Sequence, residues 1–210
     1  MFAPGAGRMI GPPALVALVL ALLEIFGGFP TPARALVAIP LAVAAALAIF
    51  FAVFFRDPAR TPGDGVVSAA DGRVRAVEIE DGRLLVSVFM NVTDVHVNRF
   101  PLAATVEGVS DGGRGFRPAY RADATHNVQR SYRLATGLGP VEVVQMTGVA
   151  ARRLVSFVGP GSVAEKGERL GMIVLGSRVD VWLPAEKVVA TVAVGDRVRA
   201  GASPIARELV

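Results

Sequence analysis

The sequence predicts a mainly β domain of the sandwich or barrel type, preceded by a pair of membrane-spanning helices. Two observations lead to this prediction. Apolar residues make up 52% of the 210-residue chain, and the longest apolar runs lie within the first 55 residues. From about residue 62 onward, short β-rich runs follow one another, separated by glycine, aspartate and proline. A chain of this length accommodates one folded domain and an appendage.

The membrane segment is expected to be a helical hairpin over residues 1–56. An apolar run at 14–29 contains one charged residue, Glu24, and a second run at 35–55 contains none. About 20 apolar residues cross a bilayer core, so the second run fits a span, and Pro30–Pro32 provides a turn. The first run is also open to a re-entrant segment or a signal-peptide core, and both runs are open to a buried helix pair in a soluble fold.

Positive charge is unevenly distributed around this hairpin. Arg8, Arg56 and Arg60 would lie on one side of the membrane, and Arg34 on the other. The positive-inside rule therefore predicts that both termini and the downstream domain lie on the cytoplasmic side of the cell membrane. Glu24 is either a functional carboxylate or a residue at the level of the lipid headgroups.

The downstream domain, residues 57–210, is expected to consist of short antiparallel strands. Asp-Gly and Gly-Asp turns separate its β-rich runs, which favours a sandwich or barrel. The runs cover residues 65–69, 72–79, 84–90, 104–109, 141–146, 154–158, 172–175, 179–183 and 188–194. Two stretches, Gly161–Gly167 and Gly195–Gly201, echo one another as glycine-bounded turns that contain a valine. This echo resembles the hairpins of barrel-sandwich domains of the biotinyl/lipoyl type.

Composition excludes several kinds of site. The chain has no cysteine, so disulfides, thiolate nucleophiles and cysteine-ligated metals are excluded. Its two histidines, His96 and His126, are too few for a multi-histidine site, and no metal is expected. The net charge is +4, but no Lys/Arg-rich run indicates nucleic acid, and anionic lipid is the simpler partner. The only lysines, Lys166 and Lys187, lie in hydrophilic turns that do not suit a buried cofactor lysine.

Gly176-Ser177 lies between two apolar runs and by itself is typical of a turn. A serine hydroxyl can also attack the preceding carbonyl, and glycine there allows the close approach that the attack needs. Three segments upstream of this pair and the segment that contains it are distinctive. They are residues 68–72 (SAADG), 89–101 (FMNVTDVHVNRFP), 144–153 (VQMTGVAARR) and 168–184 (ERLGMIVLGSRVDVWLP). Together they resemble the short type of pyruvoyl-dependent phosphatidylserine decarboxylase over about residues 57 to 190.

The resemblance implies that the chain cuts itself between Gly176 and Ser177. Ser177 would become a covalent pyruvoyl cofactor at the start of the smaller product, and the two products would stay associated. His96 matches the histidine implicated in substrate handling and proton transfer, and its neutral imidazole can accept the serine proton. Asp71 matches the aspartate of the self-processing triad, where a carboxylate fixes the tautomer of the histidine.

Three further residues concern this resemblance. Arg99 stands where the long type of the family has a second histidine, so either His96 covers both roles or another base drives cleavage. Arg130 falls in the segment that faces the substrate, although Val128-Gln129-Arg130 replaces the family's Asn-Glu-Arg. Arg130 and Arg99 are candidates for binding a substrate phosphate or carboxylate. His126 is expected to be a surface loop residue.

The resemblance therefore implies a membrane-anchored carboxy-lyase of phospholipid biosynthesis that converts phosphatidylserine to phosphatidylethanolamine and CO2. The pyruvoyl carbonyl would supply the electron sink that decarboxylation of an α-amino acid requires. Two alternatives stay open. One is a decarboxylase of another serine-headed lipid, such as archaetidylserine, and the other is a non-catalytic, membrane-tethered adaptor of the biotinyl/lipoyl type that would use Lys166. The oligomeric state is open and includes a homo-oligomer.

Overall fold

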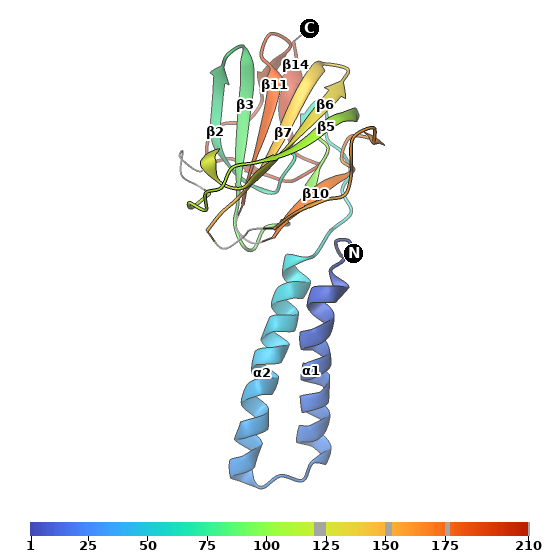
Figure 1. Cartoon of the computed structure of the whole chain (residues 1–210), viewed down its shortest axis with the longest axis vertical. Coiled ribbons are helices and arrows are strands. Elements are labelled where there is room, and N and C mark those ends of the chain that lie inside the picture. The colour runs from blue at the N-terminus through green and yellow to red at the C-terminus, as the bar shows by residue number, and fades with distance from the viewer. Residues whose placement is uncertain (120–124, 150–152, 175–176, 210) are drawn as a thin grey trace. The chain divides into compact units, whose positions relative to one another are not determined.

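The computed structural model describes residues 1–119, 125–149, 153–174 and 177–209, with the backbone alone at Thr31 and Pro32. The chain forms two compact units, Met1–Pro58 and Ala59–Val210. The first unit is helical and the second is built mainly of β-strands (Figure 1).

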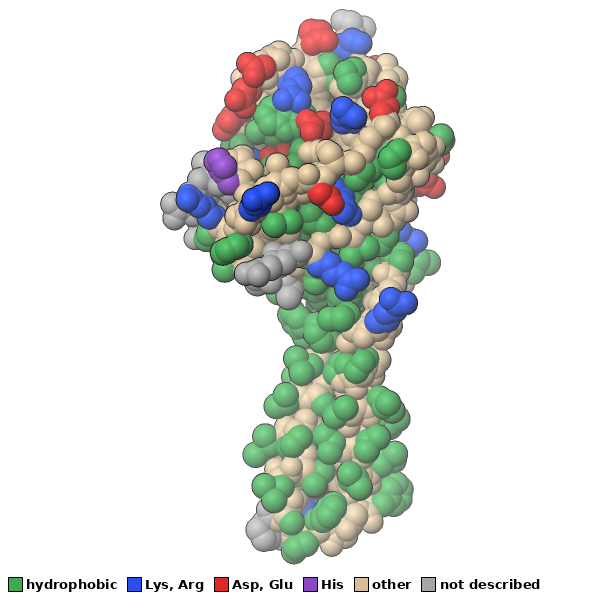
Figure 2. Space-filling view, viewed as in Figure 1, with side chains coloured by type: hydrophobic (Ala, Val, Ile, Leu, Met, Phe, Trp, Pro, Cys, Tyr) green, Lys and Arg blue, Asp and Glu red, His purple; other side chains and the backbone are tan. Residues whose placement is uncertain are grey.

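The first unit is an antiparallel pair of helices, α1 (Gly7–Phe26) and α2 (Thr31–Phe54). Both are long and apolar enough to span a membrane, with mean hydropathy 2.2 for α1 and 2.8 for Ala33–Phe54. Figure 2 shows hydrophobic side chains over most of their visible surface. The two apolar runs are therefore helical, and each helix begins several residues before its run.

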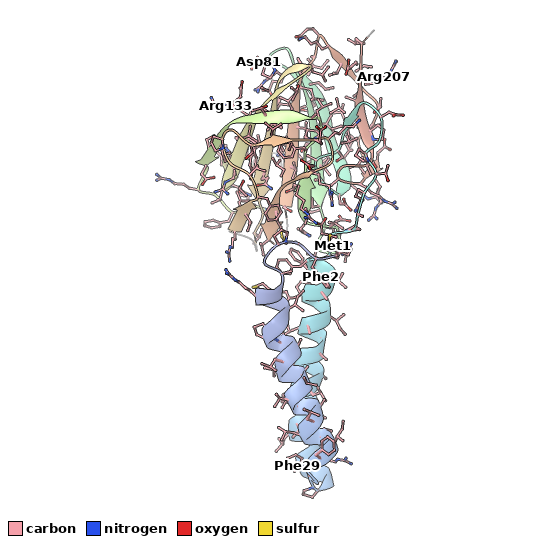
Figure 3. The ribbon with its side chains drawn as sticks, turned by 90° about the vertical axis from the view of Figure 1, so that its right-hand side faces the viewer. Met1, Phe2, Phe29, Asp81, Arg133 and Arg207 are labelled. Atoms are coloured by element: carbon pink, nitrogen blue, oxygen red, sulfur yellow. The ribbon has the colours of Figure 1, made fainter. Side chains whose placement is uncertain are left out.

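The two ends of the helical hairpin differ in charge. At the turn, which Phe29 marks in Figure 3, the Glu24 Oε1 lies 3.1 Å from the Arg34 Nε. At the open end, Phe2 and Arg56 form an isolated antiparallel β-bridge. Glu24 therefore has an ion-pair partner, and the pair leaves little net charge at the turn.

Over its described residues, the second unit contains one eight-stranded sheet and two three-stranded sheets, whose strand pairs are all antiparallel. The large sheet has the order β13-β2-β3-β11-β7-β6-β5-β9, and the small sheets have the orders β1-β14-β12 and β4-β10-β8. The strands are β1 (Val66–Val67), β2 (Gly72–Glu80), β3 (Arg83–Met90), β4 (Val97–Arg99), β5 (Ala104–Gly112), β6 (Gln129–Thr136), β7 (Gly139–Thr147), β8 (Arg153–Ser156), β9 (Val163–Ala164), β10 (Arg169–Val174), β11 (Ser177–Pro184), β12 (Val188–Ala190), β13 (Arg197–Val198) and β14 (Pro204–Glu208).

β11 lies inside the large sheet, and its side chains alternate between the two faces. Val179, Val181 and Leu183 belong to the hydrophobic core. Arg178 and Asp180 lie on the opposite face, where the guanidinium Nε donates to the carboxylate Oδ1 at 2.7 Å. The strict alternation explains why charged residues interrupt the apolar pattern of a strand in the middle of the sheet.

Each expected β-rich run overlaps a strand, but β4, β6, β9, β13 and β14 lie where no run was expected. Two of the differences have a clear physical reason. The run at 188–194 ends as a strand at Ala190, because the Asp196 carboxylate accepts a hydrogen bond from the Ala193 backbone and closes a turn. β6 lies where no run was expected, since its sequence QRSYRLAT mixes charged and polar residues. Its Tyr132 and Leu134 nevertheless point into the core, so the alternation of a half-buried strand is present.

The two echoed glycine turns occupy equivalent positions in the fold. The Gly161 N–H donates to the Val106 carbonyl, and the Gly195 N–H donates to the Val74 carbonyl, each at 2.8 Å. In return, the Val106 N–H donates to the Ser162 carbonyl, and the Val74 N–H donates to the Asp196 carbonyl. The echo in the sequence therefore corresponds to a repeated hydrogen-bond arrangement.

The second glycine of each turn extends this repeat. The Gly167 N–H donates to the Phe100 carbonyl, and the Gly201 N–H donates to the Ser68 carbonyl. Both glycines have a positive φ, 85° and 71°, which favours glycine over residues with a Cβ. A Cβ placed on Gly201 would lie 3.2 Å from the Cα of Gly167, so the two turns meet at these glycines.

Replacing Gly201 tests this meeting point. Gly201→Ala combines a left-handed backbone with a Cβ only 2.8 Å from the Cδ of Arg99. We expect the free energy of unfolding to fall by about 1–3 kcal/mol, measured as a lower melting temperature of the purified full chain in detergent. Gly137→Ala is the matched control, because no atom lies within 4 Å of a Cβ there. Equal melting temperatures for the two variants would contradict the prediction.

Candidate active site

Ser177 is the first residue of β11 and is fully buried. Its partners in the sheet are Met90, the last residue of β3, and Thr147, the last residue of β7. The serine is therefore held on both sides, at the edge where three strands of the large sheet end or begin. Gly176, the other half of the expected cleavage pair, lies outside the described residues.

The Ser177 hydroxyl contacts a methionine sulfur. Its Oγ lies 3.3 Å from the Sδ of Met90, and the Nδ2 of Asn98 lies 3.6 Å from the same sulfur. Met90 and Asn98 are both fully buried. A sulfur atom is a weak acceptor, so this contact leaves the serine hydroxyl weakly bonded.

His96 is fully buried just before β4, and its ring is oriented by the backbone. The Nδ1 lies 2.9 Å from the carbonyl oxygen of Asp94. A carbonyl only accepts hydrogen bonds, so Nδ1 carries the hydrogen and Nε2 is the basic nitrogen of the neutral ring. The His96 carbonyl accepts a hydrogen bond from the N–H of Ile173 in β10, the strand that leads to the expected cleavage position.

Asp71 has two hydrogen-bond donors, and neither is a histidine. Its Oδ2 accepts from the Arg60 guanidinium at 2.9 Å, and its Oδ1 accepts from the Ala200 N–H at 2.8 Å. The adjacent Ala69 carbonyl accepts from the backbone N–H of Arg99 in β4. Asp71 therefore holds in place the segment that is hydrogen-bonded to β4. In a catalytic triad a carboxylate would accept the hydrogen bond from the histidine Nδ1, and here the backbone carbonyl of Asp94 takes that place.

Arg99 is buried with its side chain directed at the glycine repeat. Its NH1 donates to the Gly167 carbonyl at 2.8 Å, and its Cδ would touch a Cβ on Gly201. An arginine stays protonated at any physiological pH, so Arg99 does not supply the base that a histidine at this position would supply.

A buried polar network, absent from the sequence-based expectations, leads away from the serine. The Nε2 of Gln145 donates to the Oδ1 of Asn98 at 2.7 Å, and the Tyr132 hydroxyl donates to the Oε1 of Gln145 at 3.1 Å. All three side chains are fully buried. Burial raises the pKa of Tyr132, opposed by hydrogen bonds with Ser156 and Arg130, so the hydroxyl keeps its proton at neutral pH.

One sequence signal could have indicated this network. In β7 the core-facing positions are Val141, Val143 and Gln145, so a long polar residue stands where an apolar one is expected. Gly171, opposite Asn98 in β10, is the complementary signal. A Cβ at Gly171 would lie 3.0 Å from the Tyr132 hydroxyl and 3.1 Å from the Gln145 Nε2, so the glycine makes room for the network.

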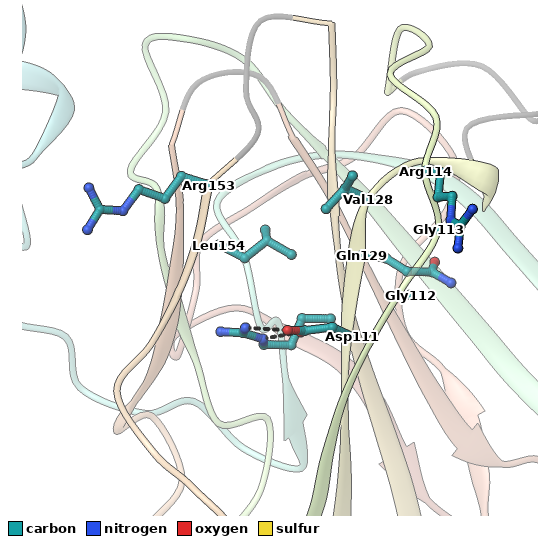
Figure 4. A pocket seen from close by; sticks show the side chains of 9 residues that line it. Asp111, Gly112, Gly113, Arg114, Val128, Gln129, Arg153 and Leu154 are labelled. Atoms are coloured by element: carbon teal, nitrogen blue, oxygen red, sulfur yellow. Dashed lines mark hydrogen bonds and ion pairs between the residues drawn. The ribbon is translucent and has the colours of Figure 1, made fainter.

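Arg130 lines an open pocket of about 620 Å³ (Figure 4). Its guanidinium makes two hydrogen bonds to Asp111, of 2.6 and 2.8 Å, and these lower the pKa of Asp111 and raise that of Arg130. Arg114 and Arg153 also line the pocket. Arg153 pairs with Val174, the last described residue of β10.

The remaining histidine lies in a loop. His126 is exposed, and its carbonyl accepts hydrogen bonds from the N–H groups of Arg114 and Gly115. Among the described residues, no group of three or more histidines, cysteines or carboxylates could hold a metal ion.

Comparison with known proteins identifies the family. The family model for phosphatidylserine decarboxylase matches residues 47–206. A phosphatidylserine decarboxylase proenzyme from Thermobifida fusca is 42% identical over 93% of this chain and 88% of its own length. One from Streptomyces griseus is 43% identical over 83% of this chain and 80% of its own. A relative from Methanococcoides burtonii, provisionally named an archaetidylserine decarboxylase proenzyme, is 42% identical over 77% of each chain. The chain therefore belongs to the phosphatidylserine decarboxylase family.

Proposed function

We propose that this chain is a self-processing decarboxylase that converts phosphatidylserine to phosphatidylethanolamine and CO2. The observation that carries the proposal is the position of Ser177, buried at the first residue of a central strand and weakly bonded to a sulfur. Family membership supports the same function, because the relatives from Thermobifida fusca and Streptomyces griseus are named phosphatidylserine decarboxylase proenzymes.

Self-cleavage uses groups of this chain. The Oγ of Ser177 bonds to the carbonyl carbon of Gly176, the Nε2 of His96 takes the hydroxyl proton, and that proton passes to the Ser177 nitrogen as the C–N bond breaks. Loss of a proton from the Ser177 Cα then breaks the Cβ–O bond of the ester and releases a carboxylate at Gly176. Water replaces the nitrogen as ammonia and leaves a pyruvoyl group at residue 177.

The residues at the site fit such a group. Ser177 is fully buried, and Asn98, a neutral donor, contacts the same Met90 sulfur as the Ser177 hydroxyl. His96, whose basic nitrogen is Nε2, is buried just before β4, the strand that bears Asn98. The pyruvoyl carbonyl supplies the electron sink that holds the substrate amine during loss of CO2. His96 then delivers a proton to the carbon that has lost CO2. Asp71 supports both reactions by fixing the segment that bears β4.

The two cleavage products are proposed to stay together. The smaller product would begin with β11, which is hydrogen-bonded to β3 on one side and β7 on the other. Separating the products would break both ladders and expose the apolar face of β11, so cleavage does not release the strand. We also propose that the repeated glycine turns make this unit a barrel-sandwich of the biotinyl/lipoyl type.

The substrate headgroup is proposed to enter the pocket beside Arg130. Three arginines, Arg114, Arg130 and Arg153, line it and favour a phosphate. Arg130 would share its guanidinium between Asp111 and the ligand. Arg99 is a further candidate for a substrate anion, although its guanidinium donates to a backbone carbonyl.

The helical hairpin is proposed to anchor the chain in the cell membrane, with the β unit on the cytoplasmic side. Arg8 and Arg56 lie at the open end of the hairpin, whereas Arg34 at the turn is paired with Glu24. The positive-inside rule counts the arginines and favours this orientation.

A second serine-headed substrate, archaetidylserine, is supported by the name of the Methanococcoides burtonii relative. The non-catalytic adaptor finds no comparable support. Its candidate lysine, Lys166, donates from Nζ to the carbonyls of Gly63 and Gly65, so it does not project freely from a turn.

Removing the nucleophile is the first test of this function. Ser177→Ala should remain a single 21.9 kDa chain and release no CO2 from phosphatidylserine in detergent micelles, because no hydroxyl is present to attack. Denaturing electrophoresis and mass spectrometry of the lipid product measure the two outcomes. A Ser177→Ala chain that is still cut, or still decarboxylates, would contradict the proposal.

Removing the base is the second test. His96→Ala should lower both the self-cleavage rate and the decarboxylation rate by about 100-fold or more, since the sequence has one other histidine, His126, and that side chain is exposed. His126→Ala is the matched control and should behave as the unaltered chain, because that side chain is exposed in a loop. Normal cleavage by the His96→Ala chain would assign the base to another residue.

Sidedness can be measured without background, since the chain has no cysteine. Phe29→Cys lies at the hairpin turn and Glu80→Cys lies in the β unit. In intact cells, a membrane-impermeant maleimide should label the first variant and spare the second until the membrane is permeabilised. Labelling of the Glu80→Cys chain in intact cells would place the β unit on the outer side.

A further inference from the structure

Asn98 directs its amide NH2 at the sulfur atom that Ser177 also contacts. The Nδ2 of Asn98 and the Oγ of Ser177 lie 3.6 and 3.3 Å from the Met90 Sδ. We propose that Asn98 is a catalytic hydrogen-bond donor in self-cleavage, stabilising the oxygen that gains negative charge when Ser177 reacts. Gln145 and Tyr132 are positioning residues that keep the NH2 in this direction. The inference rests on the proposed function.

The orientation of the Asn98 amide follows from the chemistry of Met90. A thioether has no hydrogen to donate, so only an NH2 group makes a favourable contact with it. The Asn98 Oδ1 must then face Gln145, whose Nε2 donates to it, and the Gln145 Oε1 faces the Tyr132 hydroxyl, which donates in turn. Every donor along the network therefore points towards the Met90 sulfur that the Ser177 hydroxyl also contacts.

Burial makes this direction difficult to reverse. Asn98, Gln145 and Tyr132 are all fully buried, so no bulk water replaces a mismatched hydrogen bond. A reversed Asn98 would turn its oxygen to the sulfur and its NH2 to the Gln145 NH2, which leaves both amides without proper partners. Gln145, Tyr132 and the Met90 sulfur together therefore determine that the NH2 end of Asn98 faces the sulfur.

The Asn98 donor is weakly used before the reaction. Sulfur is a weak acceptor, so the contact of 3.6 Å between the Asn98 Nδ2 and the Met90 Sδ is a weak hydrogen bond. Attack by the Ser177 hydroxyl on the Gly176 carbonyl places negative charge on the carbonyl oxygen. Hydrogen bonds to a charged oxygen are about twice as strong as those to a neutral one. The interaction is therefore stronger in the transition state than in the precursor, which is the condition for rate acceleration.

Replacing Asn98 by aspartate distinguishes a hydrogen-bond donor from a residue that only fills space. If Asn98 acts as a donor, a carboxyl at its position works only when protonated, because the ionised form has no hydrogen. Burial raises the pKa of a carboxyl, so the protonated form becomes populated at mildly acid pH. The self-cleavage rate of the Asn98→Asp chain relative to the unaltered chain should then rise as the pH falls.

The test follows self-cleavage of the full chain made by cell-free synthesis into nanodiscs. We expect Asn98→Ala to slow the disappearance of the 21.9 kDa precursor about 100-fold. Asn98→Asp should be similarly slow at about pH 8 and recover at least about tenfold, relative to the unaltered chain, by about pH 5.5. Gln145→Leu, which removes the donor that orients Asn98, should slow cleavage by about tenfold.

Asn127→Asp is the matched control. Asn127 is equally buried, and its Nδ2 donates to the carbonyls of Arg117 and Thr147, so its replacement tests the loss of a buried amide without loss of the proposed donor. Its chain should lose thermal stability, while its cleavage rate relative to the unaltered chain should show no tenfold recovery at low pH. The same recovery in Asn127→Asp would reduce the effect to stability and overturn the inference.

A second substitution, Asn98→Ser, serves if the Asn98→Asp chain does not fold. If the Asn98→Asp chain shows no thermal transition, Asn98→Ser, which keeps a hydroxyl, should cleave at least about tenfold faster than Asn98→Ala. Equal rates for the Ser and Ala variants, or an unaltered rate in Asn98→Ala, would overturn the role of Asn98. Failure of the unaltered chain to cleave would instead contradict the proposed function.

Discussion

The pairing of β11 on both sides, from its first residue onward, is the constraint on which the site depends. Ser177 is in register with Met90 on β3 and with Thr147 on β7, so its backbone is fixed by two neighbouring strands. Because side chains alternate along a strand, the same register that buries Val179 and Val181 also turns Ser177 inward. A shift of one residue would exchange the serine with Arg178 and abolish the site.

This constraint connects chemistry with stability. Ser177 begins a strand that is paired on both sides, so the proposed cleavage before it would leave the sheet intact. The outward face of β11 adds to this, since Arg178 and Asp180 form a buried ion pair there and the Ser87 hydroxyl donates to Asp180. The groups that surround Ser177 arrive from β3, from β4 and from β7, and they hold it from three directions.

Local sequence patterns were sufficient for part of this architecture. The two helices follow from uninterrupted apolar runs, β11 follows from its neighbours on either side of Gly176-Ser177, and the glycine turns follow from their repeat. β6 was not recognisable, because Arg130 and Arg133 mask an alternation that only Tyr132 and Leu134 reveal. The partners of Asp71 could not be predicted, since Ala200 is brought to it by a repeat-related turn from the far end of the chain. Similarly, nothing near Gln145 in the sequence indicates that its side-chain amide bonds to Asn98 through Nε2 and to Tyr132 through Oε1.

The central claim is that Ser177 becomes a carbonyl while its strand stays in the sheet. The most direct measurement is mass spectrometry of the purified full chain after reaction with hydroxylamine, with and without prior denaturation. The account predicts two pieces, residues 1–176 and 177–210, that separate only in denaturant, with one reactive carbonyl on the N-terminal residue of the smaller piece. An intact chain, or a smaller piece that begins with an unmodified serine, would contradict it.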